Sequence, residues 1–290
     1  MYNASLCLLS IDVEDWFHLI GAGLDYQFIG QTGGVESWGK FPSRVEQNTY
    51  WILDKLDERN VKGTFFILGW IAERFPGLVA EISKRGHEIG SHSYWHKLIP
   101  SQTPDQFRTD LRRSLEVIQN IIQVQILGFR ASSASITDWA TDIIGEEGLL
   151  YDSSLFPATY HDVYGKLKGV SNDKPIERLS NGLLEVKLSS LKLFNRQFPW
   201  SGGGYFRFLP YRVFSIGVRQ IIQQKGFFHF YIHPWELDDN PPKLKNLKLF
   251  YYYRRYVSIR RPRSRFQTLL KDFHFRPIID AVHDFGKSGG

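Results

Sequence analysis

The sequence predicts an α/β protein with a parallel sheet that closes toward a (β/α) barrel. Apolar runs of strand length alternate with segments of helical spacing along most of the 290 residues, and this alternation is typical of parallel sheets. In such a barrel, active-site residues gather where the strands end. Polar residues stand directly after five of the apolar runs, namely Asp12, His92, Arg130, Asp152 and His233.

Composition places the chain among ordinary globular proteins, because 42% of its residues are hydrophobic and 23% are charged. Its apolar runs are too short to cross a bilayer. The first ten residues have no basic stretch and lead into an acidic cluster, so they predict a strand and not a secretory signal. The single cysteine, Cys7, excludes an internal disulfide and favours a reducing compartment. We expect a cytoplasmic protein, with the inner face of the membrane as one place of action.

The first strand is predicted at residues 6–11 and ends in three carboxylates. In an extended chain, Asp12 and Glu14 fall on one side, and Asp15 joins them only if the backbone turns. Clustered carboxylates repel one another, so a strand end that holds three of them indicates a bound cation. The alternative is a solvated loop.

The later elements are predicted from apolar spacing, capping residues and Pro or Gly breaks. Ser43 and Glu46 predict a capping box at the start of the helix 43–59, and Thr103, Pro104 and Gln106 predict the start of the helix 104–122. Residues 21–42, rich in Gly and polar residues, predict a long surface loop. Helices are expected at 43–59, 69–86 with a break at Pro76, 104–122, 137–147 and 210–225, and strands at 61–68, 87–91, 125–129, 149–151, 183–189 and 227–232.

Two histidines four residues apart, His92 and His96, follow the strand expected at 87–91. If the chain coils into a helical turn there, both rings reach the same metal ion. This spacing also arises by chance, so unrelated surface or core histidines are the alternative.

The chain is basic, with a net charge of +6 and a pI near 9.2. Part of this charge lies in the tyrosine-rich segment 251–265. Arginine pairs with phosphate and carboxylate, so an anionic membrane or an acidic glycan suits this segment, and a solvated basic face is the alternative. Nucleic acid is not an expected partner, because the sequence has no motif of that class.

Several motifs resemble, in order and approximate spacing, those of the NodB-type polysaccharide deacetylases, carbohydrate esterase family four. The likeness extends from about residue 6 to residue 275. It implies a distorted, incomplete (β/α) barrel, as one domain over 1–290 with a basic C-terminal extension from about 243. Residues 11–18, 202–207 and 233–236 are similar to the subgroup that accompanies bacterial exopolysaccharide and capsule gene clusters. The motifs are Ser10-Ile11-Asp12, His92-Ser93-Tyr94-Trp95-His96, Gly128-Phe129-Arg130-Ala131-Ser132, Tyr151-Asp152-Ser153-Ser154 and Ile232-His233-Pro234-Trp235-Glu236.

The resemblance implies one divalent metal ion, usually Zn²⁺, held by a carboxylate and the two histidines, His92 and His96. The family motif has two adjacent aspartates, whereas this chain has Asp12-Val13-Glu14-Asp15. Because alternation puts Asp12 and Glu14 on one side, Asp12 is expected as general base and Glu14 as ligand, with Asp15 as the rival ligand. Such a site keeps a coordination position open for water.

The remaining catalytic roles are also implied by the resemblance. Arg130 matches the arginine that pairs with the catalytic aspartate, and His233 matches the general acid that protonates the leaving amine. Asp152 is the expected partner that orients the His233 imidazole. Taken singly, these residues also suit an ion pair, a helix or turn cap and a core histidine.

The substrate side of the site is expected from neighbouring residues. A backbone N–H near Ser133 would hold the oxyanion, although Ser132 replaces the proline usual in the family. Aromatic rings beside the motifs are candidate sugar platforms, and a glycine-rich rim at 202–204 would let a sugar approach the backbone. The alternatives are core packing and a plain loop. The platform and rim residues are Trp16, Trp95, Trp235, Tyr205 and Arg207.

The expected function is a metal-dependent hydrolase that removes an N-acetyl group from an amino sugar in a polysaccharide or a lipid-linked glycan precursor. One alternative keeps the fold and changes the substrate to a cyclic amide or imide. Another is a catalytically silent glycan-binding protein, which Ser132 and the inserted Val13 would favour.

Overall fold

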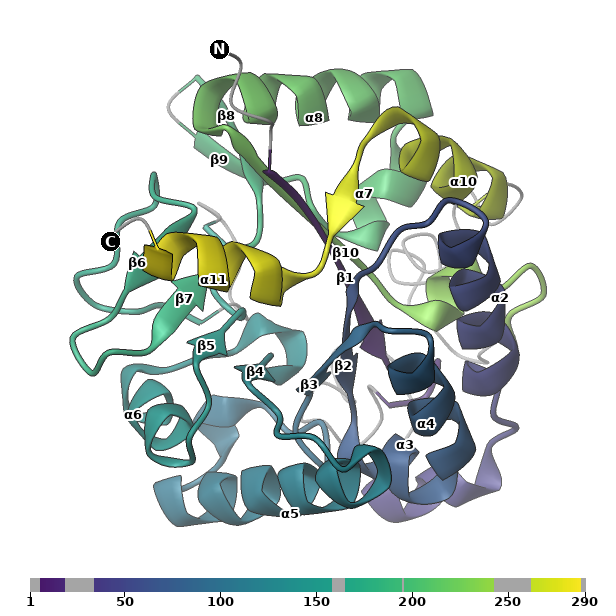
Figure 1. Cartoon of the computed structure of the whole chain (residues 1–290), viewed down its shortest axis with the longest axis vertical. Helices are drawn as coiled ribbons and strands as arrows, with labels where there is room; N and C mark the ends of the chain where they lie inside the picture. Colours follow the sequence, from purple (N-terminus) through teal and green to yellow (C-terminus); the bar gives the residue numbers. More distant parts are fainter. Residues whose placement is uncertain (1–5, 19–33, 158–164, 195, 243–261, 288–290) are drawn as a thin grey trace.

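A curled, mostly parallel sheet forms the centre of the molecule (Figure 1). The computed structural model describes residues 6–18, 34–157, 165–194, 196–242 and 262–287. The parallel strands are β1 (Leu6–Val13), β2 (Thr64–Ile67), β3 (Glu88–Ser91), β4 (Gly128–Phe129), β5 (Tyr151–Asp152), β7 (Leu184–Val186), β10 (Phe227–Ile232) and β11 (Phe275–Arg276), to which β6 (Ile176–Arg178) adds an antiparallel edge. A separate hairpin consists of β8 (Ser190–Leu193) and β9 (Arg196–Pro199).

The strand order is β10-β1-β2-β3-β4-β5-β7-β6, with β11 beside β1. Within the described residues, β10 and β6 are the two ends of this path, so the sheet curls without closing. Helices cover its outer side (Figure 1). The prediction of an α/β, distorted and incomplete barrel is therefore confirmed, because parallel strands with helical connections bury both faces of their sheet.

The helices predicted from the sequence are found close to their expected ranges, whereas α7, α10 and α11 were not predicted. The break expected at Pro76 separates α3 from α4, since proline cannot donate the backbone hydrogen bond that would continue α3. Of the loop expected at 21–42, residues 35–40 form the short helix η1. Residues 21–33 lie outside the described residues. The bounds are η1 (Val35–Lys40), α2 (Val45–Asp57), α3 (Gly69–Arg74), α4 (Pro76–Lys84), η2 (Ile99–Ser101), α5 (Pro104–Ile122), η3 (Ser132–Ala134), α6 (Asp138–Glu146), α7 (Gly203–Phe208), α8 (Tyr211–Lys225), η4 (Pro234–Leu237), α10 (Pro262–Asp272) and α11 (Ile278–Lys287).

The N-termini of two long helices are capped in different ways. The helix start predicted at Thr103 is confirmed for α5, where Thr103 and Gln106 form a capping box, each side chain accepting a hydrogen bond from the other residue's backbone N–H. The capping box expected from Ser43 at the start of α2 is wrong, because Arg44 is the N-cap and its side chain makes no capping bond. The Asp15 carboxylate, distant in sequence, takes that place.

The basic segment 251–265 is only partly described. Residues 251–261 lie outside the described residues, so the expected membrane contact there stays untested. Arg263 and Arg265 belong to α10 and bind within the protein. Arg263 donates to the Leu237 carbonyl oxygen at 2.8 Å, and Arg265 donates to the Arg207 carbonyl oxygen at 2.8 Å. In the part of the chain that the structure describes, no helix combines the length and apolar character needed to cross a membrane.

Strand register brings the ends of the parallel strands to one edge of the sheet. Ser91 at the end of β3 is paired with Ile67 and Phe129, and Phe129 is paired with Asp152. Because the carboxyl ends of these strands lie in one row, the residues that follow them are brought close together. This edge carries the candidate site.

Candidate active site

Three buried side chains at this edge could hold a metal ion. Glu14, His92 and His96 offer ligand atoms that all lie within 4.8 Å of one another. The Nε2 atom of His96 is 2.8 Å from Oε2 of Glu14. Two imidazoles and one carboxylate are a donor set that suits a divalent metal with an open coordination position. Apart from this short approach of His96, the buried Glu14 Oε2 has no hydrogen-bond partner among the described residues, which fits an atom that binds a cation.

The His92 ring is prepared for metal binding. Its Nδ1 atom donates a hydrogen bond to the Arg130 carbonyl oxygen at 2.8 Å, which leaves Nε2 free of a proton. Burial lowers the pKa of His92 to about 4. Burial raises the pKa of Glu14, but the charges of His96 and His233 outweigh it and hold that pKa far below its usual value. The site therefore offers a neutral imidazole and an ionised carboxylate at neutral pH.

The turn that carries the two histidines is not helical, which corrects the local geometry expected from their spacing. Ser93 and His96 have φ angles of 65° and 53°, in the left-handed region of the backbone. Asp110 of α5 holds the turn, since its carboxylate accepts hydrogen bonds from the N–H groups of Tyr94 and Trp95 at 2.8 and 3.1 Å. A tertiary contact thus brings the rings together.

Arg130 and Asp12 form a buried ion pair beside the cluster. The guanidinium Nη1 atom lies 3.1 Å from Asp12 Oδ1, and both side chains are buried. Further hydrogen bonds run from Arg130 to the Ser10 hydroxyl at 2.9 Å and to the Ser153 carbonyl oxygen at 2.8 Å. Because the guanidinium is bound on several sides, it fixes the Asp12 carboxylate in place.

His233 faces the cluster from the end of β10. Its Nε2 atom is 3.2 Å from Glu14 Oε1 and 3.9 Å from Asp12 Oδ2. Its Nδ1 atom is 2.8 Å from Glu236, whose other oxygen pairs with Arg207 at 3.0 Å. Burial lowers the pKa of His233, but the carboxylates of Glu14 and Glu236 outweigh it and raise that pKa to about 9. The imidazole is therefore a proton donor at neutral pH.

The expected partnership of Asp152 with His233 is wrong. Strand β5 lies beside β7, so Asp152 is paired in register with Glu185 and not with the end of β10. Its Oδ1 atom accepts a hydrogen bond from Ser154 at 2.5 Å, and burial raises the pKa of Asp152 to about 6. Glu236 orients His233 instead. The i, i+3 spacing of His233 and Glu236 is that of a capping box, so the sequence did contain a signal for this contact.

Asp15 does not join the cluster and so does not act as the rival carboxylate there. Its Oδ2 atom accepts hydrogen bonds from the Ser43 hydroxyl at 2.6 Å and from the backbone N–H groups of Arg44 and Val45 at 2.8 and 3.2 Å. The first N–H groups of α2 have no partner within the helix and carry partial positive charge, so they attract a carboxylate. Glu14 remains as the carboxylate of the candidate site.

Two of the expected substrate contacts are buried inside the protein. Trp16 is 4% exposed, packs against Phe17 and Phe41 with ring centroids 5.4 and 5.3 Å away, and donates to the Pro42 carbonyl oxygen. Arg207 is also 4% exposed and supports Glu236. Neither side chain is available as a platform or contact for a sugar, because packing and ion pairing already engage them.

The glycine-rich rim also has a packing role. A Cβ atom at Gly203 would lie 2.0 Å from Glu236 Oε2, so glycine allows α7 to approach the side chain that orients His233. Tyr205 on the same helix is 38% exposed and stacks on Trp200 at 6.4 Å. The motif therefore brings α7 against the site.

The remaining expected substrate contacts lie at or near the site. The ring of Trp235 stacks on His233 at 5.4 Å, and its Nε1 atom is 3.5 Å from Glu14 Oε1. Trp95 precedes His96 and is half-buried against Tyr94. Ser133 follows Arg130 in η3 with a φ angle of 51°, and the role of its N–H group stays a prediction.

His18 is a neighbour of the cluster that the pattern of strand ends did not identify. Its Nδ1 atom accepts a hydrogen bond from the Asp15 backbone N–H at 2.7 Å, so the ring proton sits on Nε2. That buried atom has no hydrogen-bond partner within the described ranges. Burial lowers the pKa of His18 well below its usual value, and the nearby Glu14 charge opposes this only in part. The sequence feature that could have identified His18 as a neighbour of the cluster is its position four residues after Glu14.

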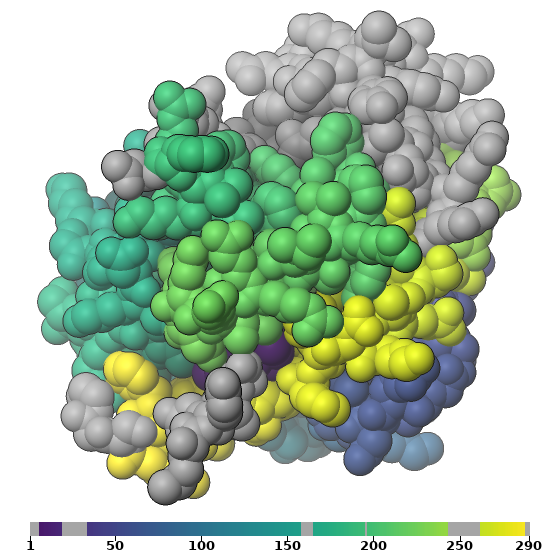
Figure 2. All heavy atoms as spheres, turned by 90° about the horizontal axis from the view of Figure 1, so that it is seen from above, coloured from purple at the N-terminus to yellow at the C-terminus, as the bar shows by residue number. Residues whose placement is uncertain are grey.

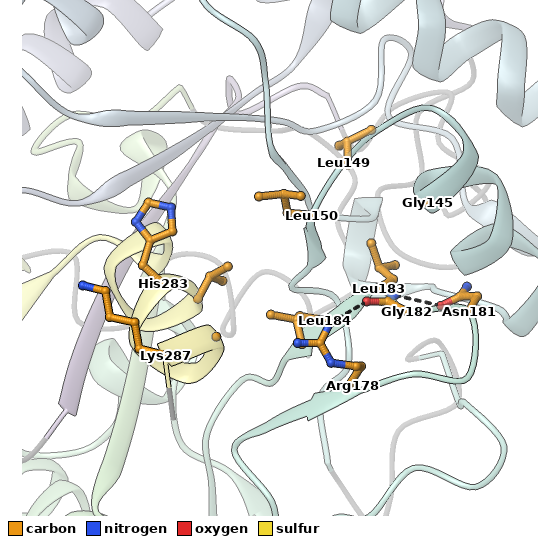
Figure 3. Close-up of a pocket in the computed structure, with 12 residues that line it drawn as sticks. Gly145, Leu149, Leu150, Arg178, Asn181, Gly182, Leu183, Leu184, His283 and Lys287 are labelled. Carbon is orange, nitrogen blue, oxygen red and sulfur yellow. Dashed lines mark hydrogen bonds between the residues drawn. The ribbon is translucent and has the colours of Figure 1, made fainter. Parts of the chain in front are cut away.

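A surface pocket of about 590 Å³ lies elsewhere, between α11 and the β6–β7 strands (Figure 3). His283 and Lys287 line it from α11, Arg178 lies on the opposite side, and Leu150 and Leu184 form part of its wall. Leu150 and Leu184 stand at the amino ends of their strands, away from the edge that carries the histidines. This pocket contains none of the candidate catalytic residues.

Comparison with protein families divides the chain in two. Residues 38–151 match the family described as polysaccharide deacetylase, and residues 153–283 match a domain of unknown function, DUF3473. A peptidoglycan-N-acetylglucosamine deacetylase of Bacillus cereus is 31% identical over 117 residues, which are 35% of this chain and 42% of that protein. The peptidoglycan-N-acetylmuramic acid deacetylase PdaA of Bacillus subtilis is 36% identical over 98 residues, 33% of this chain and 37% of that protein. The chain thus spans about two fifths of these relatives.

Solved structures share the whole fold. A structure from Mycobacterium smegmatis assigned to the polysaccharide deacetylases has a TM-score of 0.65 at 18% identity, covering 100% of this chain and 93% of that one. A pseudoenzyme of carbohydrate esterase family four from Bacillus anthracis has a TM-score of 0.52 at 14% identity, covering 97% and 66%. The same fold therefore occurs in a protein named a pseudoenzyme, so any activity must be argued from the site.

Proposed function

We propose that the protein is a metal-dependent hydrolase that removes N-acetyl groups from amino sugars in a glycan, because residues 38–151 match the polysaccharide deacetylase family. One observation carries the proposal. The Asp12–Arg130 pair and the His233–Glu236 pair flank the Glu14, His92 and His96 cluster, with His233 Nε2 within 3.9 Å of Asp12. Asp12, as a general base, and His233, as a general acid, would thus face the same buried cluster.

Glu14, His92 and His96 would hold the metal, and we propose Zn²⁺ because it favours imidazole and carboxylate ligands with an open position. When bound, such an ion would polarise the amide carbonyl and make a water molecule more acidic.

The residues of this chain supply the proton transfers. Asp12, held in place by Arg130 at 3.1 Å, would accept the proton of the attacking water. His233, protonated at neutral pH, would donate its Nε2 proton to the nitrogen of the leaving amine. Glu236 would hold the ring in position, and Arg207 would keep Glu236 ionised. The buried walls exclude bulk water and so strengthen these interactions.

The proposed substrate is an N-acetylated amino sugar, either within a polysaccharide or on a lipid-linked precursor. The two Bacillus relatives are named for N-acetylglucosamine and N-acetylmuramic acid in peptidoglycan. Half-buried Trp235 beside His233 offers a ring against which a sugar face could pack. Acetate release should therefore be measured in parallel on chitooligosaccharides, on peptidoglycan fragments and on a polyprenyl-linked amino sugar.

The decisive experiment combines metal content with acetate release. The wild type should bind about one divalent ion per chain, and His92→Ala and His96→Ala should lose both the ion and activity. His283→Ala is the control, because this histidine is exposed and lies on α11. A wild type that binds no divalent metal, even when Zn²⁺ is supplied, would refute the hydrolase proposal and favour a silent glycan-binding protein. Turnover of a hydantoin-like compound without acetate release would favour a cyclic amide hydrolase.

A further inference from the structure

One continuous segment of the chain is unusual in both charge and exposure. Between residues 186 and 235 there is no aspartate or glutamate, whereas there are seven lysines and arginines. Four of these cations are exposed, namely Lys192, Arg196, Arg212 and Arg219. A surface of this kind carries a positive potential that attracts anionic partners.

The same segment exposes large apolar side chains. Eight large hydrophobic residues are exposed in the part of the chain that the structure describes, and six of them fall between residues 194 and 216. Phe194, at the turn of the β8–β9 hairpin, is 99% exposed. The others are Phe198 on β9, Tyr205 and Phe208 on α7, and Val213 and Ile216 on α8. A group of neighbouring exposed apolar side chains is typical of an interaction site, whereas single exposed apolar residues are common on any protein surface.

These elements form one body of structure. Helix α8 packs against β8, and Trp200 after β9 stacks on Tyr205 of α7 and on Phe214 of α8, with centroids 6.4 and 6.2 Å away. Figure 2 looks onto this part of the molecule and shows the residues from β8 to α8 as one green area. The cations and the apolar side chains are therefore presented by neighbouring elements, which we call the 192–219 surface.

We propose that the 192–219 surface docks on an anionic lipid bilayer. Basic residues are attracted to anionic headgroups, and aromatic and aliphatic side chains gain free energy when they enter the boundary between headgroups and acyl chains. An acidic polysaccharide would satisfy the cations but would leave Phe194 and Ile216 in water. The combination of both features selects the bilayer.

Docking of this surface would also affect the reaction site. Helix α7 belongs to the surface and carries Arg207, which supports Glu236 behind His233. A docked protein would therefore hold its active site close to the bilayer, where a lipid-linked glycan is presented. This consequence depends on the proposed function, whereas the docking itself does not.

The test is co-sedimentation of the full chain with vesicles of phosphatidylcholine, with and without phosphatidylglycerol. We expect binding only to the anionic vesicles and weakening at high salt. Phe194→Ser with Ile216→Ser, and separately Arg212→Glu with Arg219→Glu, should each lower vesicle partitioning about tenfold. Val124→Ser and Arg178→Glu are matched controls, since both residues are exposed outside the surface.

Several results would overturn the proposal. One is a wild type that does not co-sediment with anionic vesicles. Another is that both double variants bind these vesicles as well as the control variants do. Light scattering that shows a wild-type dimer and a monomeric Phe194→Ser, Ile216→Ser variant would assign the surface to a second copy of this chain. Binding to acidic polysaccharide without vesicle binding would assign it to a glycan. Because vesicle binding needs no turnover, its failure would leave the deacetylase proposal standing.

Discussion

Replacing Glu236 with glutamine should separate the positioning of His233 from the rest of the site. The carboxylate lies 2.8 Å from His233 Nδ1 and is one of the two largest charges that raise the pKa of His233 to about 9. Glutamine keeps the size of the side chain and removes the charge. Since hydrogen bonds to charged groups contribute about 1.5–3 kcal/mol, and about 1.4 kcal/mol is a factor of ten, kcat should fall roughly 10- to 100-fold.

The pH profile distinguishes this role from a structural one. A raised pKa means that the charged imidazole stabilises the fold fully below the usual pKa of 6.5, and that this contribution is lost as pH rises through about 9. The alkaline limb of kcat, measured by acetate release, should follow the same group. In Glu236→Gln it should move down by about one pH unit or more, with the metal content unchanged.

The matched control is Glu177→Gln, which breaks a partly buried ion pair away from the site, 2.7 Å from Lys187. Both variants should lower the melting temperature, because each removes the negative charge opposite a buried cation, Arg207 in the first and Lys187 in the second. Only Glu236→Gln should change the pH profile. An alkaline limb that stays at its wild-type position in Glu236→Gln would refute the assignment of Glu236 as the residue that orients His233.

Three further predictions follow from the same contacts. Asp15→Asn should lower the free energy of unfolding by about 0.5–2 kcal/mol, the usual cost of a lost helix cap, and should keep the metal. Glu14→Gln should lose the metal. Equal metal loss in both variants, measured by elemental analysis, would contradict the separation of their roles. Burial raises the pKa of Asp152 from 3.8 to about 6, so the free energy of unfolding of the wild type should fall as pH rises between these values. Asp152→Asn should lessen that fall in urea unfolding, because an amide does not titrate, and an unchanged slope would contradict the raised pKa. A chelator should lower the melting temperature of the wild type, Zn²⁺ should restore it, and an unchanged melting temperature would argue against a resident ion.

The positions of the site residues along the chain were largely predictable. Asp12, His92, Arg130 and His233 each follow an apolar run, and parallel strands in one row necessarily bring such residues to one edge. Alternation in β1 placed Glu14 with Asp12, as the structure does. These arguments need only the local period of the chain and the general rule for parallel sheets.

The contacts of the charged residues were not predictable in the same way. Asp152 was expected beside His233 because both follow strands, but the sheet order places β5 next to β7, so Asp152 meets Glu185. Arg207 was expected on an exposed rim, but α7 packs against the site and buries it behind Glu236. A polar side chain pairs with the partner that packing brings within hydrogen-bonding distance, and distances between residues far apart in the chain cannot be predicted from the sequence alone.

By itself, therefore, the sequence determined the order of the strands and helices from β1 to β5, the positions of α8 and β10, the edge of the sheet that carries the site, and the residue types gathered there. All of these depend on local apolar period and chain order, whereas β6, the β8–β9 hairpin, α7 and the elements after residue 262 were not predicted. Only the tertiary structure decided which carboxylate serves which partner. Glu14 faces the histidines while its neighbour Asp15 turns to the start of α2, because the unpaired N–H groups of that helix lie within 2.8–3.2 Å of it. Electrostatic partners are chosen by distance in space, which folding sets.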